Sequence, residues 1–283
     1  MKYLITALIL SVLIVVLTYE PTDRDICLIT YNIKYDNHQE GPNSWASRKS
    51  SLIRLLLNHD PDIFGIQEGL VHQVQEIDLG MKNHAYVGVG RDDGKEKGEY
   101  CAIFFDSTRF RVIDESTFWL SENPDTVSIG WDAALERICT MALFEDRTSQ
   151  QRLWVFNTHF DHIGKKARRE SASLIASRIE TIKDDGYPIV LMGDFNAKPN
   201  EPPIATLKKT MSDGLEIAKS PLQGPVGTFN GFKDIIPRDR IDYIFVSTLS
   251  VKSYDHIDEK IDEKNQISDH LPIKIRAQFD WDF

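Results

Sequence analysis

Cysteine is scarce in this chain of 283 residues, which holds only Cys27, Cys101 and Cys139. An odd number of widely spaced thiols cannot form the paired framework that stabilises small disulfide-rich domains. Each cysteine lies inside an apolar, strand-like run. We therefore expect three buried, unreactive thiols. With 41% hydrophobic residues, the chain is long enough to be held together by a sizeable core.

Positive charge is also in deficit, because 33 Lys and Arg residues face 43 Asp and Glu residues and leave a formal net charge of -10. An acidic surface repels a long polyanion, so tight, sequence-indifferent binding to duplex nucleic acid is not expected. The deficit does not exclude a nuclease, because a bound metal ion and a few local cations can offset the field at a site.

Charge is absent altogether from residues 3–19, where Leu, Ile and Val dominate. Lys2 precedes this run and acidic residues follow it, which orients its N-terminus towards the cytoplasm. The segment before Glu20 lacks the small residues of a cleavage site. We predict a hydrophobic helix that acts as an uncleaved signal anchor within residues 1–22, with residues 23–283 exported. A cleaved signal peptide, which would give a secreted or periplasmic protein, is the alternative.

No Ser/Gly-rich linker, internal repeat or low-complexity block follows residue 25. Helical patterns cover residues 44–58, 70–79 and 167–182. Strand-like apolar runs cover residues 26–31, 63–66, 85–89, 101–105, 138–144, 152–157, 188–192, 241–246 and 273–277. Helices neither alternate strictly with the strands nor gather at one end. A sheet-on-sheet core with helices outside, in one domain over residues 23–283, fits this mixture best.

Short polar signatures stand at or just past the ends of these runs. In chain order they are Tyr31-Asn32-Ile33, Gln67-Glu68, Asn157-Thr158-His159, Gly193-Asp194-Phe195-Asn196, Arg240-Ile241-Asp242-Tyr243 and Ser268-Asp269-His270. An aspartate after a strand is, by itself, more often a turn or cap residue than a ligand. Together the six supply hard oxygen ligands, two histidines and two amides, which are the groups that hydrolyse a phosphoester with a divalent metal.

The six signatures, in their order and spacing, resemble the endonuclease/exonuclease/phosphatase superfamily, and the resemblance covers the chain from about Asp25 onwards. It implies an α/β fold, a deoxyribonuclease-like four-layer α/β/β/α sandwich, placed after the N-terminal hydrophobic helix. It also implies a metal-dependent phosphoesterase, that is, a phosphodiesterase, a phosphatase or a nuclease.

The resemblance assigns metal binding to Glu68, Asp269 and Asn32, with Mg²⁺ as the ion and Mn²⁺ as a substitute. Mg²⁺ usually takes only one or two carboxylates and keeps several waters, so this set suffices for one ion. Asp194 would orient and deprotonate the attacking water, and the amide of Asn196 would contact the phosphate.

Two histidines, His159 and His270, are expected to stabilise the phosphate by donating hydrogen bonds to it. By resemblance, Asp242 orients His270 and Glu99 pairs with His159, and these buried carboxylates would raise the pKa of each imidazole. Arg137 resembles a phosphate-contacting arginine, and Asn32 would contact phosphate as well as metal. For Glu99 and Arg137, an ordinary ion pair at the start of a strand is an equally good interpretation.

The substrate stays open at this point among a small phosphorylated metabolite, a phospholipid headgroup and nucleic acid. Lys34 and Tyr35 follow Asn32 where the apurinic endonuclease branch carries an acidic residue, and no long basic insertion is present. We expect a monomer that meets the membrane through its N-terminal segment. The alternative function is a non-catalytic module that binds a phosphate ligand on the same fold.

Overall fold

The computed structural model describes residues 25–279, which form two mixed six-stranded sheets. The first sheet has the order β11-β12-β1-β2-β4-β3, and the second has the order β5-β6-β7-β8-β10-β9. Strands β1 (Ile26–Asn32) and β2 (Ile63–Gln67) are parallel, as are β7 (Arg152–His159) and β8 (Ile189–Asp194). The other pairings are antiparallel; their strands are β3 (His84–Val87), β4 (Ile103–Asp106), β5 (Phe110–Trp119), β6 (Ile138–Asp146), β9 (Ser212–Asp213), β10 (Asp242–Ser247), β11 (Leu249–His256) and β12 (Ile273–Phe279).

The two sheets pack face to face, and their inner faces share one hydrophobic core. Side chains alternate between the two faces of a strand, so every second residue enters this core. On β1 these are Ile26 and Leu28, on β8 Val190 and Met192. The same alternation continues to the strand ends, where the next inward positions are polar. Because of this alternation, polar side chains at the ends of several strands point into the space between the sheets.

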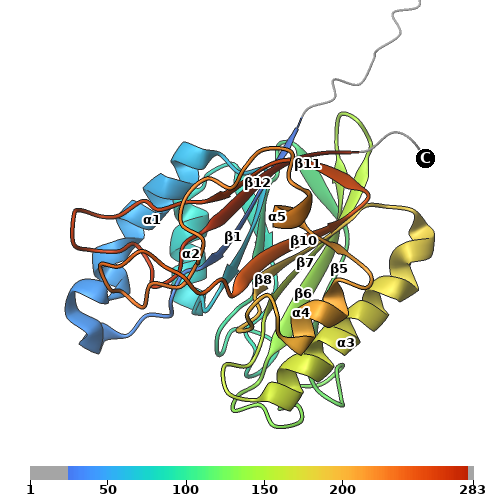
Figure 1. The fold of residues 1–283 in the computed structure, drawn as a ribbon, viewed down its shortest axis with the longest axis horizontal. Coiled ribbons are helices and arrows are strands. Elements are labelled where there is room, and N and C mark those ends of the chain that lie inside the picture. Colours follow the sequence, from blue (N-terminus) through green and yellow to red (C-terminus); the bar gives the residue numbers. More distant parts are fainter. Residues whose placement is uncertain (1–24, 280–283) are drawn as a thin grey trace, which may run out of the picture.

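Helices cover both outer faces of the pair of sheets (Figure 1). Helices α1 (Trp45–His59) and α2 (Val71–Gly80) pack on the first sheet through a core that includes Leu52, Leu56 and Ile77. Helices α3 (Lys165–Ile182) and α4 (Pro202–Leu207) cover the second sheet. Short helical turns form at His38–Asn43, Lys183–Asp185 and α5 (Gly214–Ile217).

Two mixed sheets flanked by helices confirm the predicted α/β sandwich. The predicted N-terminal hydrophobic helix lies outside the described residues. Within residues 25–279, no helix combines the length and apolarity that crossing a membrane requires. The three cysteines are buried and free, as expected, and burial raises the pKa of Cys27 to about 11 and that of Cys101 to about 12.

All nine predicted strands and all three predicted helices form, with ends shifted by a few residues. Three strands were not predicted. β5 carries exposed polar residues through its centre, β11 is an edge strand with only partial burial, and β9 has two residues. Each lacks the continuous apolar run that identified the others.

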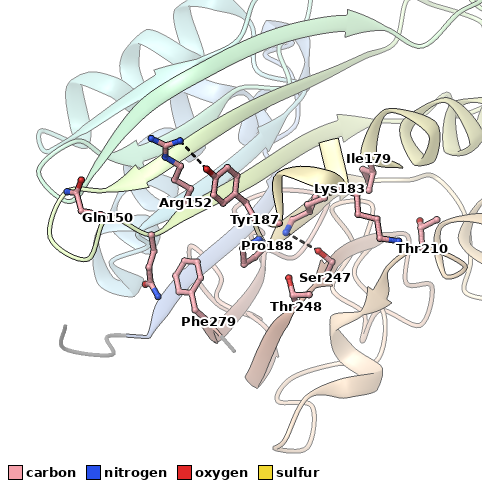
Figure 2. A pocket seen from close by; sticks show the side chains of 13 residues that line it. Gln150, Arg152, Ile179, Lys183, Tyr187, Pro188, Thr210, Ser247, Thr248 and Phe279 are labelled. Carbon is pink, nitrogen blue, oxygen red and sulfur yellow. Dashed lines mark hydrogen bonds between the residues drawn. The ribbon is translucent and has the colours of Figure 1, made fainter. Parts of the chain in front are cut away.

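A cavity of about 580 Å³ opens where β7 and β8 begin and β10 ends, lined by Arg152, Ile189 and Ser247 among others (Figure 2). Arg152 donates to the hydroxyl of Tyr187 at its rim, over 3.1 Å. Three predicted site residues, His159, Asp194 and Asp242, stand at the other ends of the same strands, so this cavity and those residues lie at opposite ends of the second sheet.

Candidate active site

Three neighbouring strands of the second sheet bring predicted site residues side by side. His159 ends β7 and pairs in register with Asp194, which ends β8. Asp194 in turn pairs with Asp242, the first residue of the antiparallel strand β10. Gly193 makes this approach possible, because a Cβ at that position would lie 2.0 Å from the carbonyl oxygen of Thr158. The register of one sheet therefore sets three of the predicted catalytic side chains in a row.

Asn32 joins this row to the first sheet. Its side-chain amide donates to Oδ2 of Asp194 over 3.0 Å and to Oε1 of Glu68 over 2.9 Å. Asn32 is fully buried at the end of β1, and Glu68 directly follows β2, the parallel neighbour of β1. Residues that span most of the chain thus meet between the sheets, as the sequence predicted.

His270 is held by Asp242 through a hydrogen bond of 2.9 Å from Nδ1 to Oδ2. Its Nε2 lies 3.7 Å from Oδ2 of Asp194. Burial opposes protonation, but the carboxylates of Asp242, Asp194 and Asp269 more than offset it and raise the pKa of His270 to about 10. Asp242 therefore orients the ring of His270 and favours its protonated form at neutral pH, which is the role that the sequence predicted.

Asp194 is the carboxylate at the centre of the site and is only 1% exposed. Its Oδ1 accepts the backbone N–H of Asn196 over 2.9 Å, and its Oδ2 lies 3.5 Å from Nε2 of His159. Burial and the neighbouring Asp242 raise the pKa of Asp194 to about 7, against the opposing effect of His270. A carboxyl group with a pKa in this range can exchange a proton at neutral pH, which is what a general base requires.

Glu68 and Asp269 present carboxylates from the two predicted metal-binding signatures. Burial opposes ionisation of Glu68, but Lys34 and the amide of Asn32 outweigh it and lower its pKa. Burial raises the pKa of Asp269, and the charge of Glu68 adds to that effect. Two partly desolvated carboxylates beside an amide are the hard oxygen donors that Mg²⁺ or Mn²⁺ accepts, and a cation there would relieve their repulsion.

A second group of possible ligand atoms consists of Asp194, Asp242 and His270, whose donor atoms lie within 4.8 Å of one another. These residues could hold a metal ion. His270, however, donates from Nδ1 to Asp242, so only Nε2 is left as a ligand atom, and the raised pKa of this imidazole favours a proton on Nε2 as well. Glu68 and Asp269 therefore fit a hard cation better than this group does.

The partner and the pKa of His159 differ from those that the sequence predicted. Glu99 lies 3.8 Å from its Nδ1, beyond a hydrogen bond, because Arg91 holds Oε2 of Glu99 at 2.6 Å. Burial, followed by the positive charges of Arg137 and Arg91, keeps the pKa of His159 well below its ordinary value. The expectation of a raised pKa is wrong, because burial and the two guanidinium charges outweigh Glu99, whose carboxylate is paired with Arg91. The lowered pKa favours the neutral imidazole.

Asn196 and Arg137 surround His159 on its other sides. The side-chain amide of Asn196 lies 3.2 Å from Nε2 of His159 and donates to the carbonyl of Phe160 over 3.0 Å. Arg137 is bound to Asp161 over 3.3 Å and to Nδ1 of His162 over 2.9 Å. Its Nη1 is buried and has no partner among the described residues. Arg137 thus combines the predicted ion pair with one unused donor.

Arg48 is a supporting residue that the sequence analysis missed. It is fully buried on α1, and its Nη1 donates to the carbonyls of Ile33 and Ile267, each over 2.8 Å. These carbonyls belong to the loops that carry Asn32 and Asp269. An arginine on the apolar face of a predicted helix was the available signal.

The loops that carry site residues also contain residues with an uncommon backbone conformation. Lys34, Glu68 and Asn196 all adopt positive φ, at 58°, 64° and 46°. For residues other than glycine this conformation is uncommon, and it persists only where the surrounding structure holds it. Each of the three lies one or two residues beyond the end of a strand, where the turn in the backbone sets the direction of the polar side chain.

The chain is similar to proteins of a known family. The model of the Endonuclease/Exonuclease/phosphatase family matches residues 29–270, which is most of the chain. The chain belongs to this family. Every predicted site residue falls within the matched segment, as does each strand except the first residues of β1 and the whole of β12.

Solved structures of bacterial family members align over nearly their whole length. A Bacteroides thetaiotaomicron protein of this family is 35% identical, with a TM-score of 0.88 over 92% of this chain and 97% of that one. The mannosyl-6-phosphatase of Bacteroides thetaiotaomicron is also 35% identical, with a TM-score of 0.85 over 90% of this chain and the whole of that one.

Eukaryotic relatives are more distant. A probable RNA exonuclease of Saccharomyces cerevisiae is 26% identical over 87% of this chain and 49% of its own length. The chain spans about half the length of several curated relatives it matches, including 47% of the Drosophila melanogaster protein angel, to which it is 31% identical.

Proposed function

We propose that this chain is a divalent-metal-dependent hydrolase of phosphoesters in which Asp194 activates water. The position of Asp194 carries the proposal, since its carboxylate lies within 3.7 Å of both histidines and accepts from Asn32. A buried carboxyl group with a raised pKa, between two phosphate-directed imidazoles, is arranged to take a proton from water as it attacks phosphorus.

Glu68 and Asp269, with Asn32, would hold the metal ion in this proposal. When bound, Mg²⁺ or Mn²⁺ supplies Lewis-acid polarisation of a phosphoryl oxygen and neutralises charge that develops there. The remaining contribution comes from the chain itself, through donors whose orientation is fixed before substrate arrives.

His270 would donate to a non-bridging oxygen throughout the reaction, because Asp242 keeps it protonated and oriented. Asn196 adds an amide donor next to His159. His159 starts neutral, and an anionic phosphate next to its Nε2 would favour its protonated form. It could then supply a proton to the leaving oxygen.

The substrate that we propose is a small phosphorylated metabolite, with a sugar phosphate as the leading class. The mannosyl-6-phosphatase relative, 35% identical over 90% of this chain, supports this choice. The net charge of -10 argues against long polyanions. RNA-directed activity, as in the name of the more distant yeast relative, is the second candidate.

Hydrolysis assays distinguish these possibilities. Mannose 6-phosphate, a phospholipid headgroup ester, an oligoribonucleotide and duplex DNA should be compared at equal Mg²⁺, with EDTA as the metal-free control. We expect Mg²⁺-dependent phosphate release that is fastest from the sugar phosphate. Turnover of the oligoribonucleotide alone would favour the second candidate, and phosphate-ligand binding without turnover would favour a non-catalytic module.

We further propose that residues 1–22 anchor an otherwise exported, monomeric protein. The uncharged run at residues 3–19 and the poor cleavage site support this topology. N-terminal sequencing of the mature protein, combined with protease accessibility in intact cells, tests it. A mature N-terminus near Glu20 would replace the anchor by a cleaved signal, and an intact N-terminus in the cytosolic fraction would contradict export.

A further inference from the structure

The loop after β1 holds one lysine in an unusual and heavily constrained conformation. Lys34 has φ 58°, and its backbone N–H donates to Oδ1 of Asn32 over 3.1 Å. Its carbonyl accepts hydrogen bonds of 3.0 Å from Arg48 and from Gln73. Three side chains therefore fix the backbone of a residue whose own conformation costs free energy, and such strain is retained mainly at functional positions.

The side chain of Lys34 points at the carboxylate end of the site. Its Nζ lies 3.6 Å from Oε2 of Glu68 and 4.2 Å from the centre of the Tyr35 ring. Oε2 also accepts the backbone N–H of Tyr35, while Oε1 of Glu68 is bound to Asn32, which contacts Asp194. With 19% of its side chain exposed, Lys34 reaches both the site and solvent.

From this geometry we propose that Lys34 determines specificity by binding a terminal phosphate oxygen, and that it selects phosphomonoester dianions over phosphodiesters. The inference rests on the proposed function of the same site. The Lys34 ammonium would lose its attraction to Glu68 if Glu68 and Asp269 held a cation. An anionic phosphoryl group in the site would then give the ammonium a new partner.

Charge explains why the effect depends on the type of ester. A phosphomonoester has a second pKa near 6 and carries almost two negative charges and three terminal oxygens above neutral pH. A diester carries one charge and two such oxygens. Four buried or partly buried carboxylates, Glu68, Asp194, Asp242 and Asp269, surround the site. The arginines near His159 are already paired, Arg137 with Asp161 and Arg91 with Glu99. The Lys34 ammonium therefore adds positive charge that stabilises a bound dianion more than a bound monoanion.

The competing role for Lys34 is that of a counter-ion, which would neutralise Glu68 and Asp269 until a metal arrives. The two roles differ in measurable ways. Removing a counter-ion changes Mg²⁺ affinity and leaves the preference between esters unaltered. Removing a phosphate donor changes that preference while Mg²⁺ affinity moves little.

The test compares three variants of the full chain. Lys34→Met removes the charge but keeps the aliphatic stem, and Lys34→Arg retains the charge. Lys183→Met removes an exposed lysine at the other end of the second sheet, beside the cavity, and serves as the control. Each is assayed with p-nitrophenyl phosphate and bis(p-nitrophenyl) phosphate at saturating Mg²⁺ and pH 8, and a Mg²⁺ titration is recorded. Calorimetry with methyl phosphate and dimethyl phosphate measures binding without turnover.

A charge-assisted hydrogen bond to phosphate is worth a factor of about 10 to 100, so Lys34→Met should lower kcat/KM for the monoester by that amount and for the diester by less than about threefold. Binding of methyl phosphate should weaken in parallel. Lys34→Arg should retain most of the preference, and Lys183→Met all of it.

Equal losses on both esters, or a loss that saturating Mg²⁺ removes, would overturn the assignment in favour of the counter-ion. If the parent protein hydrolyses neither ester, the proposed hydrolase function fails. Weaker methyl phosphate binding by Lys34→Met would still support Lys34 as the phosphate ligand, and unchanged binding would refute it.

Discussion

Asp242 and His270 form a buried hydrogen-bonded pair of 2.9 Å that links the start of β10 to the loop before β12. The pair fixes both the orientation and the charge of the imidazole. Nδ1 is committed to Asp242, so only Nε2 is available to a phosphate next to Asp194.

Replacing Asp242 by Asn should lower the pKa of His270, because the largest of the charges that raise it is lost, and leave most of the packing intact. Loss of one pre-oriented charged donor typically costs about 10²–10³ in kcat. We expect a loss in this range, with little change in KM, measured by steady-state hydrolysis of p-nitrophenyl phosphate. Asp239→Asn, on the exposed loop before β10, is the control; if both variants lose activity equally, the pair has no special role.

Glu68→Gln should weaken metal binding before it affects anything else. The amide retains an oxygen but loses the charge that attracts Mg²⁺, and even outer-shell changes cost about 10–100-fold in metal affinity. The Mg²⁺ concentration for half-maximal rate should rise by at least about tenfold, and excess Mg²⁺ should restore part of the rate. An unchanged Mg²⁺ dependence would remove Glu68 from the metal site; exposed Glu263→Gln provides the matched control.

Arg48→Met should destabilise the fold, because it leaves the carbonyls of Ile33 and Ile267 buried without donors. Each unsatisfied buried group costs about 1–3 kcal/mol, so we expect the free energy of unfolding to fall by about 2–5 kcal/mol in urea titrations. Arg54→Met, exposed on the same helix, should change it by less than about 0.5 kcal/mol. Similar values for both variants would contradict the role given to Arg48.

His256, which is not one of the predicted site residues, gives a prediction for the stability of the fold in acid. It is 2% exposed, its Nδ1 donates to the carbonyl of Pro225 over 2.7 Å, and its Nε2 is buried without a partner. Burial lowers its pKa; the nearby charges are Arg240, which adds to the shift, and Asp242 and Asp213, which oppose it.

Because the unfolded imidazole takes up its proton at a higher pH than the folded one, stability should be full above pH ~6.5 and fall below it. One such group contributes a slope of up to about 1.4 kcal/mol per pH unit. His256→Asn keeps the donor but cannot titrate, so its unfolding free energy should depend less on pH between 6.5 and 5 than that of the parent. An identical pH dependence for this variant and the parent would refute the prediction; exposed His38→Asn is the control.

Sequence patterns were sufficient to predict most strands of the two sheets, because strands such as β6 and β8 are buried along their whole length and read as continuous apolar runs. They failed for β5, whose central residues are exposed and polar at the edge of the second sheet. Edge strands bury less, so their apolar signal is weaker and the pairing partner decides whether they form.

The site was predictable for the residues that end strands, because register and alternation place Asp194, Asp242 and His159 together. Its electrostatics were not predictable. The effect of Glu99 on His159 depends on Arg91, which precedes Glu99 by eight residues. The ion pair between Arg91 and Glu99 forms only in the folded loop and has no signature in the sequence. Arg48 was missed for a similar reason, since its partners are carbonyl groups that carry no sequence signature.

The central claim, that Asp194 activates water for metal-dependent phosphoester hydrolysis, is tested most directly by kcat of Asp194→Asn at saturating Mg²⁺. The exposed Asp184→Asn variant is the control, and calorimetry verifies Mg²⁺ binding in all three proteins. Loss of a general base costs about 10²–10⁴-fold, or roughly 3–5 kcal/mol in the transition state. We predict that loss for Asp194→Asn alone, with folding and Mg²⁺ affinity retained. Turnover within about threefold of the parent would contradict the claim, because another group would then activate the water.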